Sequence, residues 1–182
     1  MHVEDAQREV RTVFVGGFWG QLVSSALWLT SAALATWDTP RAAILTAVFG
    51  GFLIFPAVLL LLRLSGGPTY LSKDNPLGGL GMQIAFTLPP AMFLLIPVTQ
   101  FHLNFFYPAL MILLGAHYIP FVFSYGMRMF APLAAILIFS GLGIAHYFNG
   151  SFSLGGWVCG VTLFVFAWIG RATVRREARA RA

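Results

Sequence analysis

Six apolar stretches, each long enough to cross a lipid bilayer as a helix, follow one another along almost the whole chain. A hydrocarbon core of about 30 Å requires about 20 helical residues. The stretches that reach this length are approximately 13–37, 42–62, 77–98, 105–125, 129–148 and 152–170. We therefore predict an all-α polytopic membrane bundle of six transmembrane helices. Its parts are an N-terminal segment 1–12, a transmembrane domain 13–170 and a basic tail 171–182.

Positive charge is almost confined to one side of this predicted domain. Cytoplasmic loops of membrane proteins are enriched in Lys and Arg, which orients the chain during insertion. Of the 11 cations, only Arg41 falls on the far side. The others precede the first span, lie in the second and fourth loops, or follow the last span: Arg8, Arg11, Arg63, Lys73, Arg128, Arg171, Arg175, Arg176, Arg179 and Arg181. Both termini are therefore predicted to be cytoplasmic.

The composition excludes a water-soluble globular protein. Hydrophobic residues make up 58% of the chain and charged residues only 9%, whereas a soluble domain is about one quarter charged. The net charge of +5 could suggest nucleic-acid binding, but its cations flank apolar stretches instead of forming a patch on a soluble fold. We expect no nucleic-acid partner. We expect the arginine-rich tail to attract anionic lipids, by about 1 kcal/mol for each cation near the surface.

Glycines at four-residue spacing provide a means of close helix packing. Transmembrane helices associate through close backbone approach, because lipid chains are as apolar as the side chains themselves. Gly16 and Gly20 have this spacing in the first span, and Gly156 and Gly160 have it in the sixth. We expect packing within the bundle, with a homodimer through either pair as the alternative.

Acidic side chains are absent from all six predicted spans. The six acids lie at the termini or in loops: Glu4, Asp5, Glu9, Asp38, Asp74 and Glu177. Ion-coupled carriers usually bury a carboxylate, and metal sites in helical bundles combine Glu with His. We therefore predict no metal site, no cofactor and no catalytic residue, and the sequence does not favour an enzyme.

The polar candidates for a binding site lie in the third and fourth spans. His117 falls within about one helical turn of the predicted midplane, where a titratable side chain either functions or bonds a neighbouring helix. Pro120 leaves the carbonyl of Ala116 without its helical partner, and Pro89-Pro90 breaks the third span in the same way. Kinks are predicted at these prolines and at Pro56. The predicted binding residues are Gln83, Thr87, Tyr107, His117, Tyr118 and Tyr125.

The sequence resembles a family of small bacterial integral membrane proteins that is classed as a domain of unknown function. The likeness rests on Asn75-Pro76-Leu77 with Gln83, and most specifically on Gly115-Ala116-His117-Tyr118-Ile119-Pro120-Phe121 followed by Tyr125-Gly126-Met127. The last two spans and the tail carry no part of it. The resemblance implies a six-helix protein of the bacterial inner membrane and transfers no functional residue.

Three functional hypotheses remain open at the level of sequence. The first is a small transporter-like or channel-like protein for a neutral or weakly polar solute or a lipid, with Gln83, His117 and Tyr118 around a hydrated cavity. The second is a non-transporting scaffold, sensor or assembly partner, in which these residues only hold the bundle. The third is a membrane-embedded enzyme with His117 as acid or base, although no nucleophile accompanies it.

Overall fold

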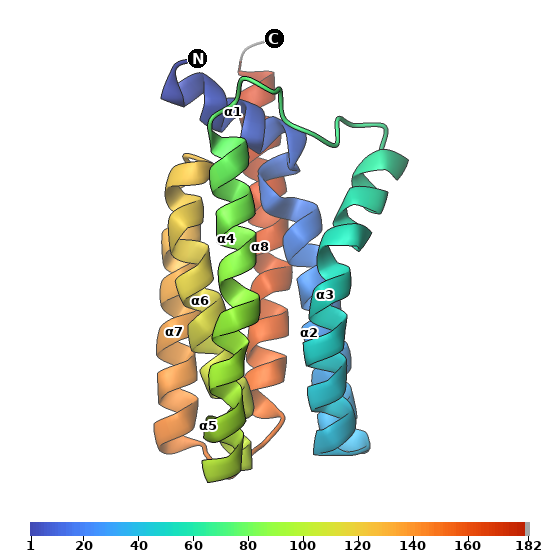
Figure 1. Ribbon diagram of the computed structural model, residues 1–182, viewed down its shortest axis with the longest axis vertical. Coiled ribbons are helices and arrows are strands. Elements are labelled where there is room, and N and C mark those ends of the chain that lie inside the picture. The colour runs from blue at the N-terminus through green and yellow to red at the C-terminus, as the bar shows by residue number, and fades with distance from the viewer. Residues whose placement is uncertain (181–182) are drawn as a thin grey trace.

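Helices account for nearly all of the computed structural model, which describes residues 1–180 (Figure 1). In chain order the α-helices are α1 (Val3–Val13), α2 (Phe18–Trp37), α3 (Pro40–Leu64), α4 (Leu77–Ala91), α5 (Leu95–Phe101), α6 (Phe106–Ser124), α7 (Phe130–Tyr147) and α8 (Leu154–Arg179). Short 3-10 turns lie at η1 (Val15–Gly17), η2 (Met92–Leu94) and η3 (Leu103–Phe105). The predicted all-α fold is confirmed.

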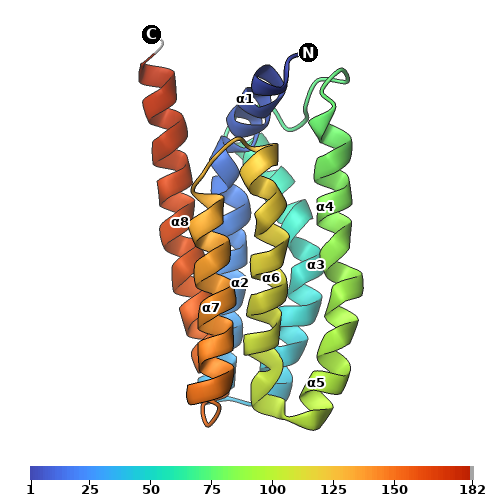
Figure 2. The ribbon, with the colours of Figure 1, turned by 90° about the vertical axis from the view of Figure 1, so that its left-hand side faces the viewer.

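The long helices run up and down in an antiparallel bundle, so both termini lie at the same end (Figures 1 and 2). We call this the terminal end and the other the opposite end. By length and composition, five helical stretches could cross a membrane, or six if the bent pair formed by α1 and η1–α2 is one span. One of the five combines α4, η2 and α5 over Leu77–Phe101.

The predicted proline positions do not end α3 or α6, whereas α4 ends at Ala91, one residue after Pro90. Pro56 lies inside α3, Pro89 and Pro90 lie inside α4, and Pro120 lies inside α6. After the double proline, the backbone tightens into the 3-10 turn η2. This tightening is expected because proline cannot donate a backbone hydrogen bond to the preceding turn.

The first apolar stretch is broken near its start, where the sequence predicted one continuous helix from Val13. Val15, Gly16 and Gly17 have positive φ values of 51°, 63° and 81°, and the helices on either side differ in direction by 62°. Glycine adopts this left-handed backbone at little cost. The result is that α2 begins at Phe18, and that most of segment 1–12 forms the separate helix α1.

Helix α1 lies across the terminal end of the bundle and is fastened to three other segments (Figure 1). Gln7 Nε2 donates to the carbonyl oxygen of Phe123 at 2.7 Å. Arg11 donates to the carbonyl oxygen of Tyr125 at 2.7 Å and forms an ion pair with Glu177 of α8 at 3.2 Å. The carboxylate of Glu9 accepts hydrogen bonds from the 65–76 loop, as described below. Thus α1 ties α6, α8 and the α3–α4 connection together.

Glycines allow close backbone approach in two helix pairs, α2 with α8 and α6 with α7. Between α2 and α8, a Cβ at Gly156 would lie 2.9 Å from the Cβ of Ala32, and one at Gly160 would lie 2.7 Å from the side chain of Leu29. Between α6 and α7, a Cβ at Gly115 would lie 2.9 Å from the carbonyl oxygen of Ala134. These contacts agree with the expected packing within the chain.

Of the four glycines considered for a homodimer, three are occupied inside the bundle. Gly156 and Gly160 face α2, and Gly16 faces the backbone of Gly170. Gly20 alone has no atom within 4 Å of the position that its Cβ would take. A dimer through Gly156 and Gly160 would therefore have to displace contacts that the single chain already makes.

The helix order places the charges at the ends of the bundle as the sequence analysis predicted. The segments before α2, between α3 and α4, between α6 and α7, and at the end of α8 all meet at the terminal end, whereas Arg41 lies at the opposite end. Arg181 lies outside the described residues. At the opposite end, Trp37 and Tyr147 are each 76% exposed, as expected for the ring types that prefer a membrane interface, whereas Tyr107 is fully buried inside the bundle.

Candidate functional site

The six predicted binding residues do not surround one cavity. Gln83 and Thr87 are exposed on α4, and His117 is half-buried on α6. Tyr107 and Tyr118 are 0% and 5% exposed, whereas Tyr125 is half-buried at the end of α6. Among these residues the structure brings together Thr87 with His117, and His117 with Tyr118. Gln83 makes no hydrogen bond within the described residues.

His117 and Thr87 form a polar contact between α6 and α4. The ring Nδ1 lies 3.4 Å from Thr87 Oγ1, whose single proton is donated to the carbonyl oxygen of Ile84 at 2.7 Å. The hydroxyl oxygen can therefore only accept from the ring, which assigns the proton to Nδ1. The ring also packs edge-on against Phe121, with centroids 5.2 Å apart. This arrangement joins α4 and α6.

Tyr107 belongs to a buried hydrogen-bonded chain that joins three helices. Ser31 of α2 donates to the carbonyl oxygen of Ala43 in α3 at 2.8 Å. Its oxygen lies 2.6 Å from the Tyr107 hydroxyl of α6, so the tyrosine is the donor in that bond. Trp28 and Phe152 pack beside the Tyr107 ring, at centroid distances of 5.8 and 5.2 Å. Each hydroxyl is thus satisfied by protein, which is the pattern of a dry interior.

Tyr118 and Tyr125 belong to an aromatic cluster nearer the terminal end, centred on Phe130. The ring centroid of Phe130 lies 6.0 Å from that of Tyr118, 5.6 Å from that of Phe121 and 5.0 Å from that of Tyr125. Gln21 borders this cluster: a Cβ on Gly17 would lie 3.1 Å from its Nε2 and 3.2 Å from Phe130. Both amide atoms of Gln21 are buried without a hydrogen-bond partner in the described part of the chain.

An apolar groove lies between α3 and the α4–α5 stretch, in the half of the bundle nearer the opposite end. Its volume is about 230 Å³. Helix α3 contributes Ile44, Val48 and Phe52, and the other wall is formed by Pro89, Met92, Phe93, Leu95, Ile96 and Thr99, with Phe106 between the two. The only hydroxyl, on Thr99, donates to backbone carbonyl oxygens of its own helix. The groove therefore offers a surface that only an apolar group matches.

Sequence reasoning missed this groove because nothing polar marks it. Helix α3 packs chiefly against α2, and α4 chiefly against α6, so the two helices form separate edges of the bundle. Pro89 and two residues of the 3-10 turn η2, Met92 and Phe93, lie on the groove wall. The proline break was visible in the sequence, but its position opposite α3 depends on the packing of the whole bundle.

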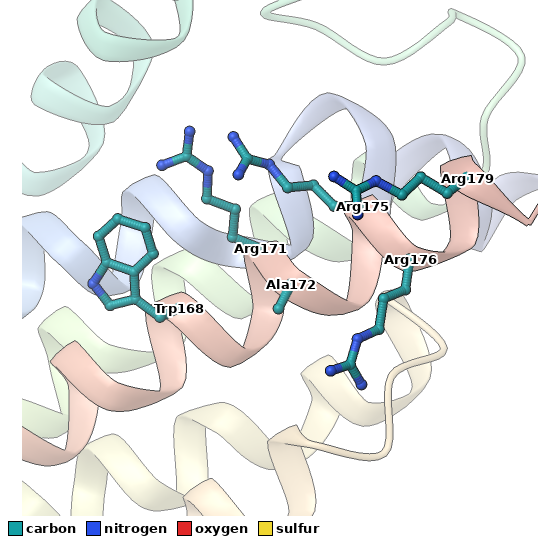
Figure 3. Close-up of a pocket in the computed structure, with 6 residues that line it drawn as sticks. All are labelled: Trp168, Arg171, Ala172, Arg175, Arg176 and Arg179. Atoms are coloured by element: carbon teal, nitrogen blue, oxygen red, sulfur yellow. The ribbon is translucent and has the colours of Figure 1, made fainter.

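A second hollow, of about 240 Å³, lies on the last part of α8, which extends past α6 and α7 at the terminal end (Figure 2). It is lined by Trp168, Arg171, Ala172, Arg175, Arg176 and Arg179 (Figure 3). Figure 3 shows Arg171, Arg175 and Arg179 projecting from one side of the helix and Arg176 from the other. The guanidinium carbon of Arg171 lies 4.6 Å from the ring centroid of Phe18 and 5.4 Å from that of Trp168.

Within residues 1–180, no group of three or more His, Cys, Asp and Glu side chains is arranged to hold a metal ion. The one cysteine, Cys159, is buried and free.

The fold is a helical bundle with five or six helices that are long and apolar enough to cross a membrane, which indicates a helical membrane protein. Residues 3–172 match a family of unknown function (DUF7010), and the chain belongs to this family. The match confirms the resemblance to a family of unknown function. It also extends over the last two predicted spans, which carried no part of the likeness noted in the sequence. No curated protein and no solved structure matched the chain.

Proposed function

We propose that this protein is a multi-pass protein of the bacterial inner membrane that binds a lipid chain or another apolar solute in the groove between α3 and α4–α5. The sequence analysis considered a neutral or weakly polar solute and a lipid as possible solutes. The proposal favours the lipid over the polar solute. The observation that carries the proposal is the groove itself, whose walls come from helices that pack chiefly on different neighbours.

The chemistry of the groove supports an apolar occupant. Pockets for small molecules usually combine apolar walls with a few polar groups that fix orientation. Here the walls carry only the Thr99 hydroxyl, and that group is already bonded to its own helix. Phe49, Leu53 and Leu94 are exposed on the same helices. An acyl chain could thus enter sideways from the bilayer without breaking a hydrogen bond.

The positions of the polar residues argue against a hydrated central pathway. Tyr118 is buried, Gln83 is exposed, and neither hollow described above is lined by Gln83, His117 or Tyr118. A pathway for a polar solute would need several such groups to face one opening. We therefore place binding at the groove and not around His117.

Photolabelling tests this proposal. The protein is reconstituted in nanodiscs with a phospholipid that carries a photoactivatable acyl chain, and the labelled residues are mapped by mass spectrometry. We expect Met92 and Phe93 to be labelled more strongly than Phe164, which is an exposed residue of α8. Val48→Trp fills the groove and should reduce this labelling severalfold. Val165→Trp, on the exposed surface of α8, should leave it unchanged.

Uniform labelling of all exposed apolar residues would contradict the proposal, because the groove would then be ordinary lipid-facing surface. A leaflet-exchange assay with a fluorescent phospholipid in liposomes separates carriage from static binding. If Val48→Trp slows this lipid exchange and Val165→Trp does not, the protein carries lipid between the leaflets through the groove.

The alternative function is a non-transporting scaffold, sensor or assembly partner. It is favoured by the buried chain from Tyr107 through Ser31 to Ala43, which holds three helices together and leaves no hydroxyl for a ligand. A scaffold would show neither selective labelling of the groove nor lipid exchange.

A further inference from the structure

The arginines at the end of α8 form a ladder with regular spacing. Arg171, Arg175 and Arg179 are four residues apart, so consecutive side chains lie on one face and about 6 Å apart along the axis. Figure 3 shows the three guanidinium groups on the same side of the helix. Together with Trp168 they line the hollow of about 240 Å³.

The length of α8 places this ladder at the level of lipid headgroups. Counted from Leu154, Arg171 lies about 26 Å and Arg179 about 38 Å along the helix at 1.5 Å per residue. A hydrocarbon core is about 30 Å thick, and its headgroup regions extend a further 5–8 Å on each side. With Leu154 taken at one edge of the core, the backbone of Arg171 lies about 4 Å inside the other edge, from which a long arginine side chain can reach the headgroups. Arg175 and Arg179 then lie in the headgroup region, at the end predicted to be cytoplasmic. Trp168, at the start of the ladder, has the ring type that prefers this interface.

No ion pair within the described residues offsets the positive charge of the ladder. Glu177, on the same helix, pairs with Arg11 of α1. In the described part of the chain, no carboxylate lies within ion-pair distance of Arg171, Arg175 or Arg179. Arg171 is also held in place by the rings of Phe18 and Trp168. A guanidinium that is already oriented loses less side-chain freedom when it binds an anion.

We propose that Trp168, Arg171, Arg175 and Arg179 form a binding site for the phosphate headgroup of an anionic phospholipid in the cytoplasmic leaflet. Arginine binds phosphate through two parallel hydrogen bonds, so it provides direction as well as charge. The site does not depend on the groove between α3 and α4–α5, which lies at the other end of the bundle. Either proposal can fail without the other.

Native mass spectrometry of the purified full chain tests this site. The protein in a non-ionic detergent is titrated with phosphatidylglycerol or with phosphatidylcholine of the same acyl chains. We expect the wild type to bind phosphatidylglycerol more tightly. Since each cation near a membrane surface contributes about 1 kcal/mol, Arg171→Gln/Arg175→Gln/Arg179→Gln should weaken its binding tenfold or more.

Two further variants distinguish the effect of the ladder from an effect of total charge and from an effect of misfolding. Arg8→Gln/Arg63→Gln/Arg128→Gln removes the same charge from exposed arginines at the same end and should change the affinity less than threefold. Because Arg171 packs on two rings, Arg175→Gln/Arg179→Gln is measured as well. Both of these arginines are exposed, and the double variant should retain the fold while losing part of the preference.

Three results would overturn the proposal. The first is a wild type that does not distinguish the two lipids. The second is a control triple variant that loses as much affinity as the ladder variant, which would mean diffuse attraction. The third is displacement of bound phosphatidylglycerol by millimolar inorganic phosphate, which would identify a site for a soluble anion.

Discussion

At the residue scale, single glycines decide how the first helix enters the bundle. Gly16 has a φ of 63°, and a Cβ at this position would lie 2.7 Å from the carbonyl oxygen of Gly170. The same residue therefore provides the left-handed turn between α1 and α2 and the close approach of η1 to α8. No other residue type meets both requirements without strain.

We predict that Gly16→Ala destabilises the protein by at least about 2 kcal/mol. The left-handed backbone costs an alanine about 1–2 kcal/mol, and the contact with Gly170 adds to this. Gly20→Ala is the matched control, since nothing lies within 4 Å of its Cβ position and alanine favours a helix. Denaturant unfolding in detergent measures both variants. Equal stability of the two would mean that the turn at Gly16 is not required.

At the element scale, α1 is the part of the chain whose role the sequence least revealed. It was expected only as a cytoplasmic segment, yet it forms a helix that closes the terminal end. Ser72 donates to the carboxylate of Glu9 through its backbone N–H and its hydroxyl, and the Asn75 amide donates at 2.8 Å. These donors hold the pKa of Glu9 below its ordinary value of 4.5, with the Ser72 backbone N–H contributing most.

This pKa shift predicts how the docking of α1 depends on pH. A carboxyl group whose pKa is lowered by folding stabilises the docked form at any pH above its ordinary value, and this contribution is lost as pH falls through the lower folded value. We expect the α1–loop contact to be constant near neutral pH and to loosen below 4.5. Hydrogen exchange of the α1 amides, corrected for intrinsic rates, measures this.

Glu9→Gln should remove this part of the pH dependence, because its amide carries no titrating charge. Glu4→Gln, in the first turn of the same helix, should preserve it. Equal exchange of the α1 amides at pH 7 and pH 3 would show that the hydrogen bonds of Glu9 with Ser72 and Asn75 do not hold α1 in place.

At the scale of the whole molecule, the bundle has a tightly packed part and two looser edges. The pairs α2–α8 and α6–α7 interlock through glycines, whereas α3 and α4 each pack chiefly on one long neighbour. The buried Tyr107–Ser31–Ala43 chain crosses from one part to the other, since it joins α6, α2 and α3. It therefore contributes to holding the α3 edge in place and to the shape of the groove.

We predict that Ser31→Ala destabilises the bundle more than Tyr107→Phe. A hydrogen bond between membrane helices contributes about 0.6–1.7 kcal/mol, and Tyr107→Phe removes one such bond. Ser31→Ala removes two and leaves the tyrosine hydroxyl buried without a partner. Tyr147→Phe is the control, because Tyr147 is 76% exposed. Unfolding in detergent gives the order, and a larger loss for Tyr107→Phe would refute the assigned direction of donation.

The candidate site was only partly predictable from the sequence. The deep position of His117 and the proline break at Pro89-Pro90 were visible, because both depend on position along a span. The partners were not visible. His117 bonds Thr87 across two helices, and Tyr107 bonds Ser31, a residue that no sequence pattern marked. Partners on different spans depend on which helices are neighbours and on how each is rotated, and hydropathy records neither.

What the sequence determined by itself is the class of structure, and it also predicts an orientation. A bilayer core offers no water to the backbone N–H and C=O groups, so these apolar stretches satisfy them internally by forming helices. The distribution of the cations predicts which end is cytoplasmic. The tertiary structure decided the bend at Gly16, the buried Tyr107–Ser31–Ala43 chain, the groove between α3 and α4–α5, and the pairing of Glu177 with Arg11. These features arise from contacts between distant segments, whereas the spans and their charges are local.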